Sequence, residues 1–198
     1  MHPFLIHQKL EYRIFIVEQY GNKTFNKGRV FNAGFKEVMK YEQWRCIIFH
    51  DVDLLPLNSR ILYSCPSFPR HMSPVFFNSK GVRFWYAMFG GVTAMTPAHY
   101  EQVNGHSNLY WGWGAEDNDM YWRLRGVGLP VFRYDKIYAQ YLALPHQREP
   151  ENPDRYKLLH TSIDRWKLEG LNDIEYNVIS TKLEHLYTHI VVDIDIDP

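Results

Sequence analysis

Apolar and polar positions divide the first part of the chain into short strand-like runs and one segment with helical spacing. The segment Tyr12–Val17 is rich in β-branched and aromatic residues, which predicts a strand. Apolar side chains then recur at helical spacing over 26–41, which predicts a helix. The continuous apolar run Cys46–Phe49 predicts a strand that is buried on both faces. This strand–helix–strand order favours a βαβ unit with a parallel sheet.

The remainder of the chain continues the mixture of helices and strands, and the predicted fold class is therefore α/β. The Pro-, Ser- and Asn-rich stretch Pro56–Pro74 is typical of a loop. Helices are expected from Thr96-Pro97, over 116–125 and around 155–169, and strands over 129–134 and 186–194. Ligands in α/β folds bind at the carboxyl ends of strands.

Composition and charge exclude some classes of function. The 198 residues suffice for one domain, and 45% hydrophobic with 22% charged residues is typical of a globular protein rather than a disordered one. Lys and Arg together equal Asp and Glu in number, so nothing favours a nucleic-acid partner or electrostatic attachment to an anionic membrane. The aromatic content of 16% has two interpretations: most rings form the core, or some form platforms for the faces of sugars.

The cellular location is left open by these residues. No apolar run has the length of a membrane helix, and Met1–Phe4 does not resemble the start of a signal peptide. The chain is therefore cytosolic, or a targeting segment is absent from it. Cys46 and Cys65 could form one disulfide or remain two free buried thiols. The triplet Asn22-Lys23-Thr24 is a glycosylation sequon, which supports a secretory location only beside other evidence.

Asp51-Val52-Asp53 directly follows the apolar run Cys46–Phe49. In an extended segment, alternation would point both carboxylates to the same side. Two hard oxygen donors could then hold Mn²⁺ or Mg²⁺, and the ion could neutralise a diphosphate. The alternative is a solvated strand end without a ligand.

The segment Trp111–Asp119 reads W-G-W-G-A-E-D-N-D and is the least ordinary part of the chain. Its glycines would let the loop bend and act as a lid. A Trp ring can stack on a sugar, and an acid beside it can accept a proton from a hydroxyl nucleophile. The alternative is a helix N-terminus with favourable acids and a buried Trp pair.

Two further motifs carry weaker signals. His146 lies in a polar, Pro-containing loop, where a histidine can be a metal ligand or a surface residue. Phe89-Gly90-Gly91 would allow the backbone to approach a ligand closely, or would form a tight turn or bulge.

Taken together, these motifs resemble the β-1,4-galactosyltransferase family, including its members that transfer N-acetylgalactosamine. The similarity runs over nearly the whole chain, and the W-G-W-G-x-E-D-x-D block is its most specific part. The matching segments are Phe25-Asn26, Asn32–Phe35, Phe49–Asp53, Pro69–His71, Phe89–Val92, Asn104-Gly105, Trp111–Asp119, Arg155-Tyr156, Gly170–Asn172 and Leu186–Thr188.

The resemblance implies a GT-A-like glycosyltransferase domain with a mixed, mostly parallel sheet flanked by helices. It implies an inverting enzyme that moves Gal or GalNAc from UDP-Gal or UDP-GalNAc to the 4-hydroxyl of a terminal GlcNAc or Glc. The acceptor would be a glycoprotein or glycolipid glycan, and the cofactor Mn²⁺ or Mg²⁺. The expected location is the lumenal side of the Golgi apparatus, as part of a type II membrane protein.

The resemblance also implies roles for individual residues. The metal ligands would be Asp53 and His146, and the disulfide would join Cys46 to Cys65. The catalytic pair would be Asp117, as the general base on the acceptor hydroxyl, and Glu116, which orients groups near it. The donor would be bound by Asp51, Asp53, Met88, Gly90, Gly91 and Trp113. The acceptor would be bound by Asp117, Asn118, Arg155, Tyr156 and Leu159.

Four positions depart from the family pattern. Ala143 stands where many members have a Met three residues before the ligand His, so we expect weaker or altered metal dependence. Asn118 replaces an Asp in the acidic run, which would weaken acceptor contacts, and Ala115 replaces a loop Gly, which would restrict loop motion. Met88 replaces a Tyr that is typical of galactose-specific members, which favours use of UDP-GalNAc alone or beside UDP-Gal.

The expected organisation is one catalytic domain over 1–198 that is incomplete at its N-terminus. Family members carry an earlier strand and an Arg-containing segment for the nucleotide, and this chain starts after them. Contact with a membrane is expected only through an anchor absent from this chain. The alternative function is a catalytically weak or inactive carbohydrate-binding protein on the same fold.

Overall fold

The computed structural model describes residues 1–196, which gather into two compact units. The first unit comprises 1–11, 44–100 and 124–148, and the second comprises 12–43, 101–123 and the described residues from Glu149 onward. Each unit is assembled from segments that are separate in the sequence. The expectation of a single domain over 1–198 stays a prediction.

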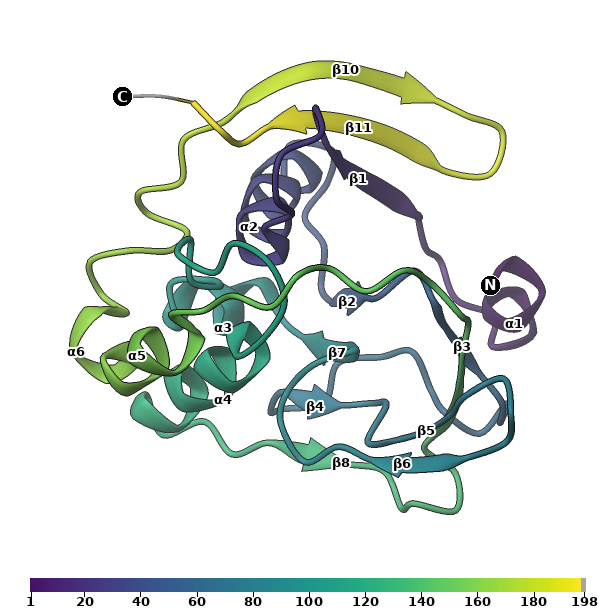
Figure 1. Cartoon of the computed structure of the whole chain (residues 1–198). Helices are drawn as coiled ribbons and strands as arrows, with labels where there is room; N and C mark the ends of the chain where they lie inside the picture. The colour runs from purple at the N-terminus through teal and green to yellow at the C-terminus, as the bar shows by residue number, and fades with distance from the viewer. Residues whose placement is uncertain (197–198) are drawn as a thin grey trace. The chain divides into compact units, whose positions relative to one another are not determined.

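The first unit contains helix α1 (His2–His7) and two four-stranded sheets (Figure 1). One sheet has the order β2 (Ile47–His50), β7 (Val92–Met95), β4 (Arg70–His71), β8 (Phe132–Arg133). The other has the order β3 (Leu54–Pro56), β9 (Gln140–Ala143), β5 (Val75–Phe77), β6 (Arg83–Trp85). β7 is one of the two inner strands of the first sheet, and all four of its residues are buried.

The second unit contains a three-stranded sheet in the order β1 (Phe15–Gln19), β11 (Thr188–Asp193), β10 (Asn177–Leu183). Helix α2 (Lys27–Val38) packs against β1 and β11 (Figure 1). The short helices α5 (Arg155–His160) and α6 (Ser162–Arg165) follow one another. Helices α3 (Pro97–Gln102) and α4 (Glu116–Gly126) each carry residues of both units.

The α/β class and the mixed sheets are confirmed, but the expectation of mostly parallel strands is wrong. Among the described residues, five of the eight strand pairings are antiparallel. The predicted βαβ unit is also wrong, because β1 pairs with β11 while β2 pairs with β7 in a different sheet. Helical and strand periodicity identify elements, but they carry no information about which strands pair.

Several predicted elements are confirmed with shifted ends, and others are corrected. Strand β2 is only half-buried apart from Phe49, so it is not the doubly buried strand that its apolar run predicted. The expected loop Pro56–Pro74 contains β4, and the helix expected around 155–169 is two short helices. The sequence did not predict α1, β3, β5, β6, β7, β9 or β10.

The core of the second unit lies between α2 and its sheet. Asn26 caps the helix, since its side-chain oxygen accepts the Arg29 N–H at 2.9 Å. The buried core side chains are Val30, Ala33, Ile190, Val192 and Ile194. Gly34 allows the close approach, because a Cβ there would lie 2.8 Å from Val17 of β1.

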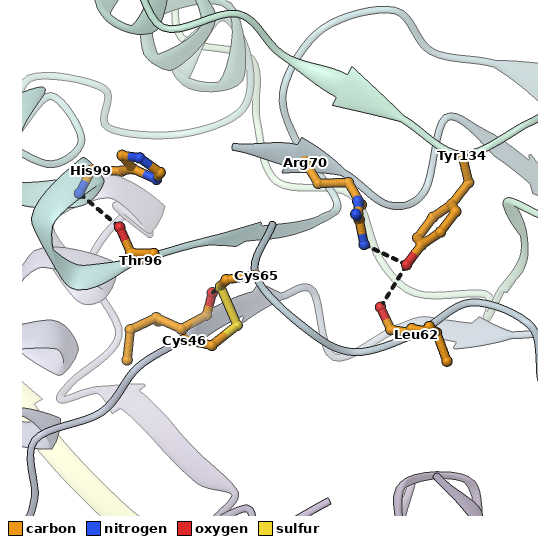
Figure 2. The surroundings of a disulfide bond; sticks show 8 residues. Cys46, Leu62, Cys65, Arg70, Thr96, His99 and Tyr134 are labelled. Atoms are coloured by element: carbon orange, nitrogen blue, oxygen red, sulfur yellow. Dashed lines mark hydrogen bonds between the residues drawn. A yellow bond between two sulfur atoms is a disulfide. The ribbon is translucent and has the colours of Figure 1, made fainter. Parts of the chain in front are cut away.

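A disulfide joins the two cysteines of the first unit (Figure 2). Cys46 precedes β2, Cys65 lies in the loop before β4, and their Cα atoms are 5.3 Å apart. This confirms the pairing that the family resemblance implied. Closing a loop of this length contributes roughly 3 kcal/mol in the chain-entropy model.

The disulfide loop is also held by side chains of the first unit. Figure 2 shows the Tyr134 hydroxyl donating to the carbonyl of Leu62 at 2.9 Å and accepting from the Arg70 guanidinium.

In the same view, Thr96 Oγ1 accepts the His99 N–H at 3.2 Å, which confirms Thr96 as the N-cap of α3.

A buried ionic network organises the second unit. Arg123 of α4 is fully buried and donates to Asp119 Oδ1 at 2.7 Å, and it also contacts the Glu169 carboxylate. Arg165 of α6 donates to the other Asp119 oxygen at 2.5 Å and contacts the same Glu169. Tyr110 donates its hydroxyl to Asp119 at 2.9 Å. Two carboxylates and two guanidinium groups therefore neutralise each other away from water.

We predict that Arg123→Met lowers the free energy of unfolding by about 3–5 kcal/mol, because it leaves buried carboxylates with half of their cationic partners. Urea unfolding measures this difference. Arg125→Met, on the exposed side of the same helix, is the matched control, and its effect should stay within about 0.5 kcal/mol. Equal small effects of both substitutions would contradict the prediction.

Candidate functional site

Asp51, Val52 and Asp53 form a turn between β2 and β3 rather than an extended segment. The Leu54 N–H donates to the Asp51 carbonyl at 3.2 Å, which closes the turn, and Val52 is 85% exposed. The prediction that alternation points both carboxylates to one side is therefore wrong, since a turn has no such alternation. The Asp51 N–H donates to the Gly91 carbonyl at 3.0 Å and so anchors the turn to the residue that precedes β7.

The antiparallel pairing of β3 with β9 brings Asp53 next to His146. Leu54 lies opposite Ala143, and the Leu144 N–H donates to the Asp53 carbonyl at 2.8 Å. His146 follows directly, and its Nε2 lies 3.5 Å from Asp53 Oδ2. Both side chains reach solvent. The structure therefore brings together the two residues that the sequence proposed as metal ligands.

The His146 ring is oriented for coordination. Its Nδ1 lies 2.8 Å from the Gln147 carbonyl, and because a carbonyl only accepts, Nδ1 carries the hydrogen. In the neutral ring, Nε2 then presents its lone pair on the side of Asp53. One carboxylate oxygen and one imidazole nitrogen at this separation suit a divalent ion such as Mn²⁺.

The protein supplies few donors at this position. Within residues 1–196, no group of three or more His, Cys, Asp or Glu side chains could hold a metal ion. Ala143, which lies opposite Leu54, offers no donor atom. The remaining coordination positions of a bound ion would therefore fall to water or to oxygens of a ligand.

Gly91 is required by the protein's own packing. Its φ is +69°, a region that favours glycine, and a Cβ would lie 2.6 Å from Ser73 Oγ and 2.9 Å from Leu54 Cδ1. Ser73 Oγ donates to the Gly90 carbonyl and accepts the Val92 N–H. These contacts favour the tight-turn interpretation of the two glycines. Met88, just before this turn, is half-buried.

A hydrogen-bonded chain that the sequence did not reveal supports the Asp51–Asp53 turn. His50 Nδ1 donates to the Asp51 carbonyl at 2.8 Å, and its Nε2 accepts from the Tyr63 hydroxyl at 3.0 Å. Tyr63 lies 3.2 Å from the Tyr141 hydroxyl of β9. Burial lowers the pKa of His50, so the ring stays neutral as this arrangement requires. The only sequence signal was the position of His50 directly before the Asp-Val-Asp triplet.

In the second unit, the Trp111–Ala115 loop is tied to Pro150–Asn152. The Trp113 N–H donates to the Pro150 carbonyl at 2.8 Å, and the Asn152 N–H donates to the Trp113 carbonyl at 3.0 Å. Gly112 and Gly114 have positive φ, and so does Ala115, at +72°. A non-glycine residue in this region costs about 1 kcal/mol. The expected effect of Ala115 on loop motion stays a prediction, and Trp113 is 43% exposed.

Glu116 and Asp117 begin α4, as the sequence predicted, and Lys27 lies against both. The Lys27 ammonium is 3.1 Å from Asp117 Oδ1 and 3.7 Å from Glu116 Oε1. The three side chains are largely buried, with 13–16% of each exposed. Sequence reasoning missed Lys27, although it directly follows the family-like pair Phe25-Asn26.

The proposed acceptor residues lie on the same unit. Asn118 follows Asp117 in the first turn of α4 and is half-buried. Arg155 packs on the loop, since a Cβ at Gly114 would lie 2.9 Å from its Cδ, and its guanidinium is 4.7 Å from the Tyr156 ring centroid. Tyr156 is 62% exposed and Leu159 is half-buried. An exposed ring beside a guanidinium suits a polar ligand with hydroxyl groups.

Two family models match the sequence. One describes the N-terminal region of glycosyl transferase group 7 and matches residues 1–66. The other describes the N-terminal domain of galactosyltransferase and matches residues 70–147.

Curated relatives match over the whole chain. β-1,4-Galactosyltransferase 3 of Homo sapiens is 41% identical over 203 residues, which cover 100% of this chain and 51% of the relative. β-1,4-Galactosyltransferase 4 of Cricetulus griseus is 42% identical, over 98% of this chain and 57% of the relative. The chain therefore spans about half the length of the curated relatives it matches.

Solved structures also match over the whole of this chain. The catalytic domain of Drosophila β1,4-galactosyltransferase 7 in complex with xylobiose has a TM-score of 0.83 and 28% sequence identity. The match covers 100% of this chain and 86% of that one. A mutant of the same enzyme, in complex with manganese, UDP-Gal and xylobiose, has a TM-score of 0.82. The GT-A-like fold of the chain is thereby established.

Proposed function

Because the chain belongs to the β-1,4-galactosyltransferase family, we propose that it is the catalytic part of an inverting glycosyltransferase. The donor is UDP-Gal or UDP-GalNAc, and the acceptor is the 4-hydroxyl of a terminal GlcNAc or Glc on a glycan. The proposal rests mainly on the proximity of the Asp53 and His146 side chains, which the pairing of β3 with β9 brings together. The solved relative that contains manganese and UDP-Gal supports the same chemistry.

The metal-binding residues of the proposal are Asp53 and His146. A bound Mn²⁺ or Mg²⁺ would offset the negative charge of the UDP leaving group. Asp53 contributes a carboxylate oxygen, and the hydrogen bond from His146 Nδ1 to the Gln147 carbonyl keeps Nε2 available. Asp51, Met88, Gly90 and Gly91 are the proposed donor contacts of the first unit.

Asp117 is the proposed general base. It accepts the proton of the acceptor hydroxyl as that oxygen attacks the anomeric carbon. The Lys27 ammonium lies 3.1 Å from Asp117 Oδ1 and 3.7 Å from Glu116 Oε1, and so holds both carboxylates at the start of α4. Asn118, Arg155, Tyr156 and Leu159 bind the acceptor in this proposal, and the exposed Trp113 ring covers a sugar face.

The proposed location is the Golgi lumen. The Cys46–Cys65 disulfide supports an oxidising compartment, since such bonds are rare in the cytosol. No helix among residues 1–196 is long and apolar enough to cross a membrane.

The second candidate is a carbohydrate-binding protein with little or no activity on the same fold. The small number of protein donors around Asp53 favours it. The two candidates differ in a direct assay with labelled UDP-sugar, a GlcNAc-terminated acceptor and Mn²⁺. Transfer of label to the acceptor supports the enzyme, whereas acceptor binding without transfer supports the second candidate.

Removal of the base tests the enzyme directly. We predict that Asp117→Asn lowers kcat by about 10²–10⁴, because an amide cannot accept the proton. Steady-state transfer to a GlcNAc-terminated acceptor measures the loss, and far-UV circular dichroism checks the fold. Asp164→Asn, an exposed position on α6, is the matched control and should retain wild-type turnover. A wild-type rate in Asp117→Asn would contradict the role of this carboxylate.

Ala143 offers a test of the metal-binding residues. Because it lies opposite Leu54, beside Asp53, a thioether at this position can add a third protein ligand. We predict that Ala143→Met reaches half-maximal activity at a lower Mn²⁺ concentration. Ala143→Leu, of similar size but without sulfur, should match the wild type. An unchanged Mn²⁺ activation curve in Ala143→Met would contradict this metal position.

Met88 tests the choice of donor. A Tyr hydroxyl can hydrogen-bond at the C2 side of the donor sugar and crowd an N-acetyl group, whereas Met can do neither. We predict that Met88→Tyr lowers the ratio of kcat/KM for UDP-GalNAc to that for UDP-Gal by about tenfold or more. Met88→Leu should leave the ratio unchanged. Rejection of UDP-GalNAc by the wild-type chain would refute its use as a donor.

A further inference from the structure

We propose that Asn22 is an N-glycosylation site and that the first sugar of its glycan lies against the indole of Trp111. The inference goes beyond the transfer reaction and rests only on the proposed lumenal location. Asn22-Lys23-Thr24 is the single Asn-x-Ser/Thr triplet without proline in the 198 residues.

The loop between β1 and α2 exposes this triplet completely. All residues from Gly21 to Phe25 are exposed, and a Cβ at Gly21 would meet no atom within 4 Å. Gly21 has a φ of +84°, which turns the chain outward just before Asn22. In the part of the chain that the structure describes, no hydrogen bond or ion pair uses the Asn22 side chain. A glycan on this amide would therefore displace no internal contact.

Other residues hold the loop in place. Gln19 Nε2 donates to the Thr24 carbonyl at 3.1 Å, and Gln19 Oε1 accepts the Asn26 N–H at 2.9 Å. The Lys23 ammonium pairs with the Asp195 carboxylate. The loop keeps its shape without Asn22, so a modified and an unmodified side chain can project from the same backbone.

A hollow of about 390 Å³ opens next to the triplet. It is lined by Asn22, Lys23, Thr24, Trp111 and Asp195, all of which belong to the second unit. Its volume is within the range of sites that bind small ligands. The C–H face of a sugar packs well on an aromatic ring, and the Lys23 and Asp195 groups can hydrogen-bond sugar hydroxyls. The Arg29 guanidinium lies 5.4 Å from the Trp111 ring centroid and helps to fix that ring.

The modification uses a lipid-diphosphate-linked oligosaccharide as its co-reactant. A bond forms between Asn22 Nδ2 and the anomeric carbon of the first sugar, while the bond from that carbon to the diphosphate oxygen breaks. Nδ2 loses one proton, and the lipid diphosphate leaves. Disulfides form in the oxidising lumen of the endoplasmic reticulum, where this reaction also occurs. The disulfide of the first unit therefore supports passage of the chain through that compartment.

To test the modification, the full chain is expressed in eukaryotic cells behind a leader that directs the chain to the endoplasmic reticulum. The wild type should show a mobility shift that peptide-N-glycosidase removes, and mass spectrometry should locate the deamidated position at Asn22. Asn22→Gln and Thr24→Ala should lose the shift. Thr24→Ser is the matched control, because it keeps the sequon and should keep the glycan.

Lys80→Thr supplies a control for location, since it completes a second sequon at Asn78, before the exposed Ser79. A glycan at Asn78 in this variant without one at Asn22 would overturn the modification site. A chain that carries a glycan at neither position would contradict the lumenal delivery, and the proposal with it. Transfer activity is a separate readout, so failure of the catalytic proposal would not affect this result.

The place of the first sugar is tested by thermal unfolding before and after enzymatic removal of the glycan. The wild type should have a lower Tm once the glycan is removed. In Trp111→Leu both forms lose core packing, but the difference between them should vanish, because the sugar has no indole to cover. An unchanged difference in Trp111→Leu would show that the sugar lies elsewhere.

Discussion

The second unit depends on one buried carboxylate. Asp119 is fully buried and accepts hydrogen bonds from Arg123, Arg165 and the Tyr110 hydroxyl. An isolated charge in this position would carry a large desolvation cost, so the segments that hold its partners must come together as the unit folds. Asp119 thereby connects α4 to α6 and to the start of the Trp-Gly-Trp-Gly loop.

The network also determines what the other acids of the same run can do. Glu116 and Asp117 precede Asp119 in the first turn of α4, and they meet Lys27 rather than the arginines. A backbone whose third acid, Asp119, is fixed in the interior holds the first two acids in defined positions. Arg123 extends this order by donating to the backbone carbonyl of Glu169 at 3.1 Å. Neighbouring residues of one polar run therefore have different surroundings: Asp119 is fully buried among arginines, whereas Asp117 pairs with Lys27 and keeps 13% of its side chain exposed.

In the first unit, the pairing of strands determines which side chains lie next to one another. The β3–β9 pair fixes Asp53 next to His146, and the hydrogen bond from Asp51 to Gly91 fixes the turn beside the Gly-Gly segment. The His50–Tyr63–Tyr141 chain supports the turn through hydrogen bonds and through contacts between its rings. The proximity of Asp53 to His146 thus depends on pairing between strands far apart in the chain, and the disulfide between Cys46 and Cys65 restrains the connecting loop.

The sequence by itself determined some of the helices and strands, and the motifs. Apolar spacing predicted α2, acids in the first turn and arginines in the last predicted α4, and the Thr96 cap predicted the start of α3. The family resemblance implied the disulfide, which the structure contains, and proposed Asp53, His146 and Asp117 as site residues. These features depend on local propensity or on a specific order of residue types. Only the tertiary structure decided the antiparallel pairings, the turn at Asp51–Asp53, the contact of Lys27 with Asp117 and the burial of Asp119. Those features depend on contacts between segments far apart in the chain, and local periodicity carries no record of which distant partner a residue meets.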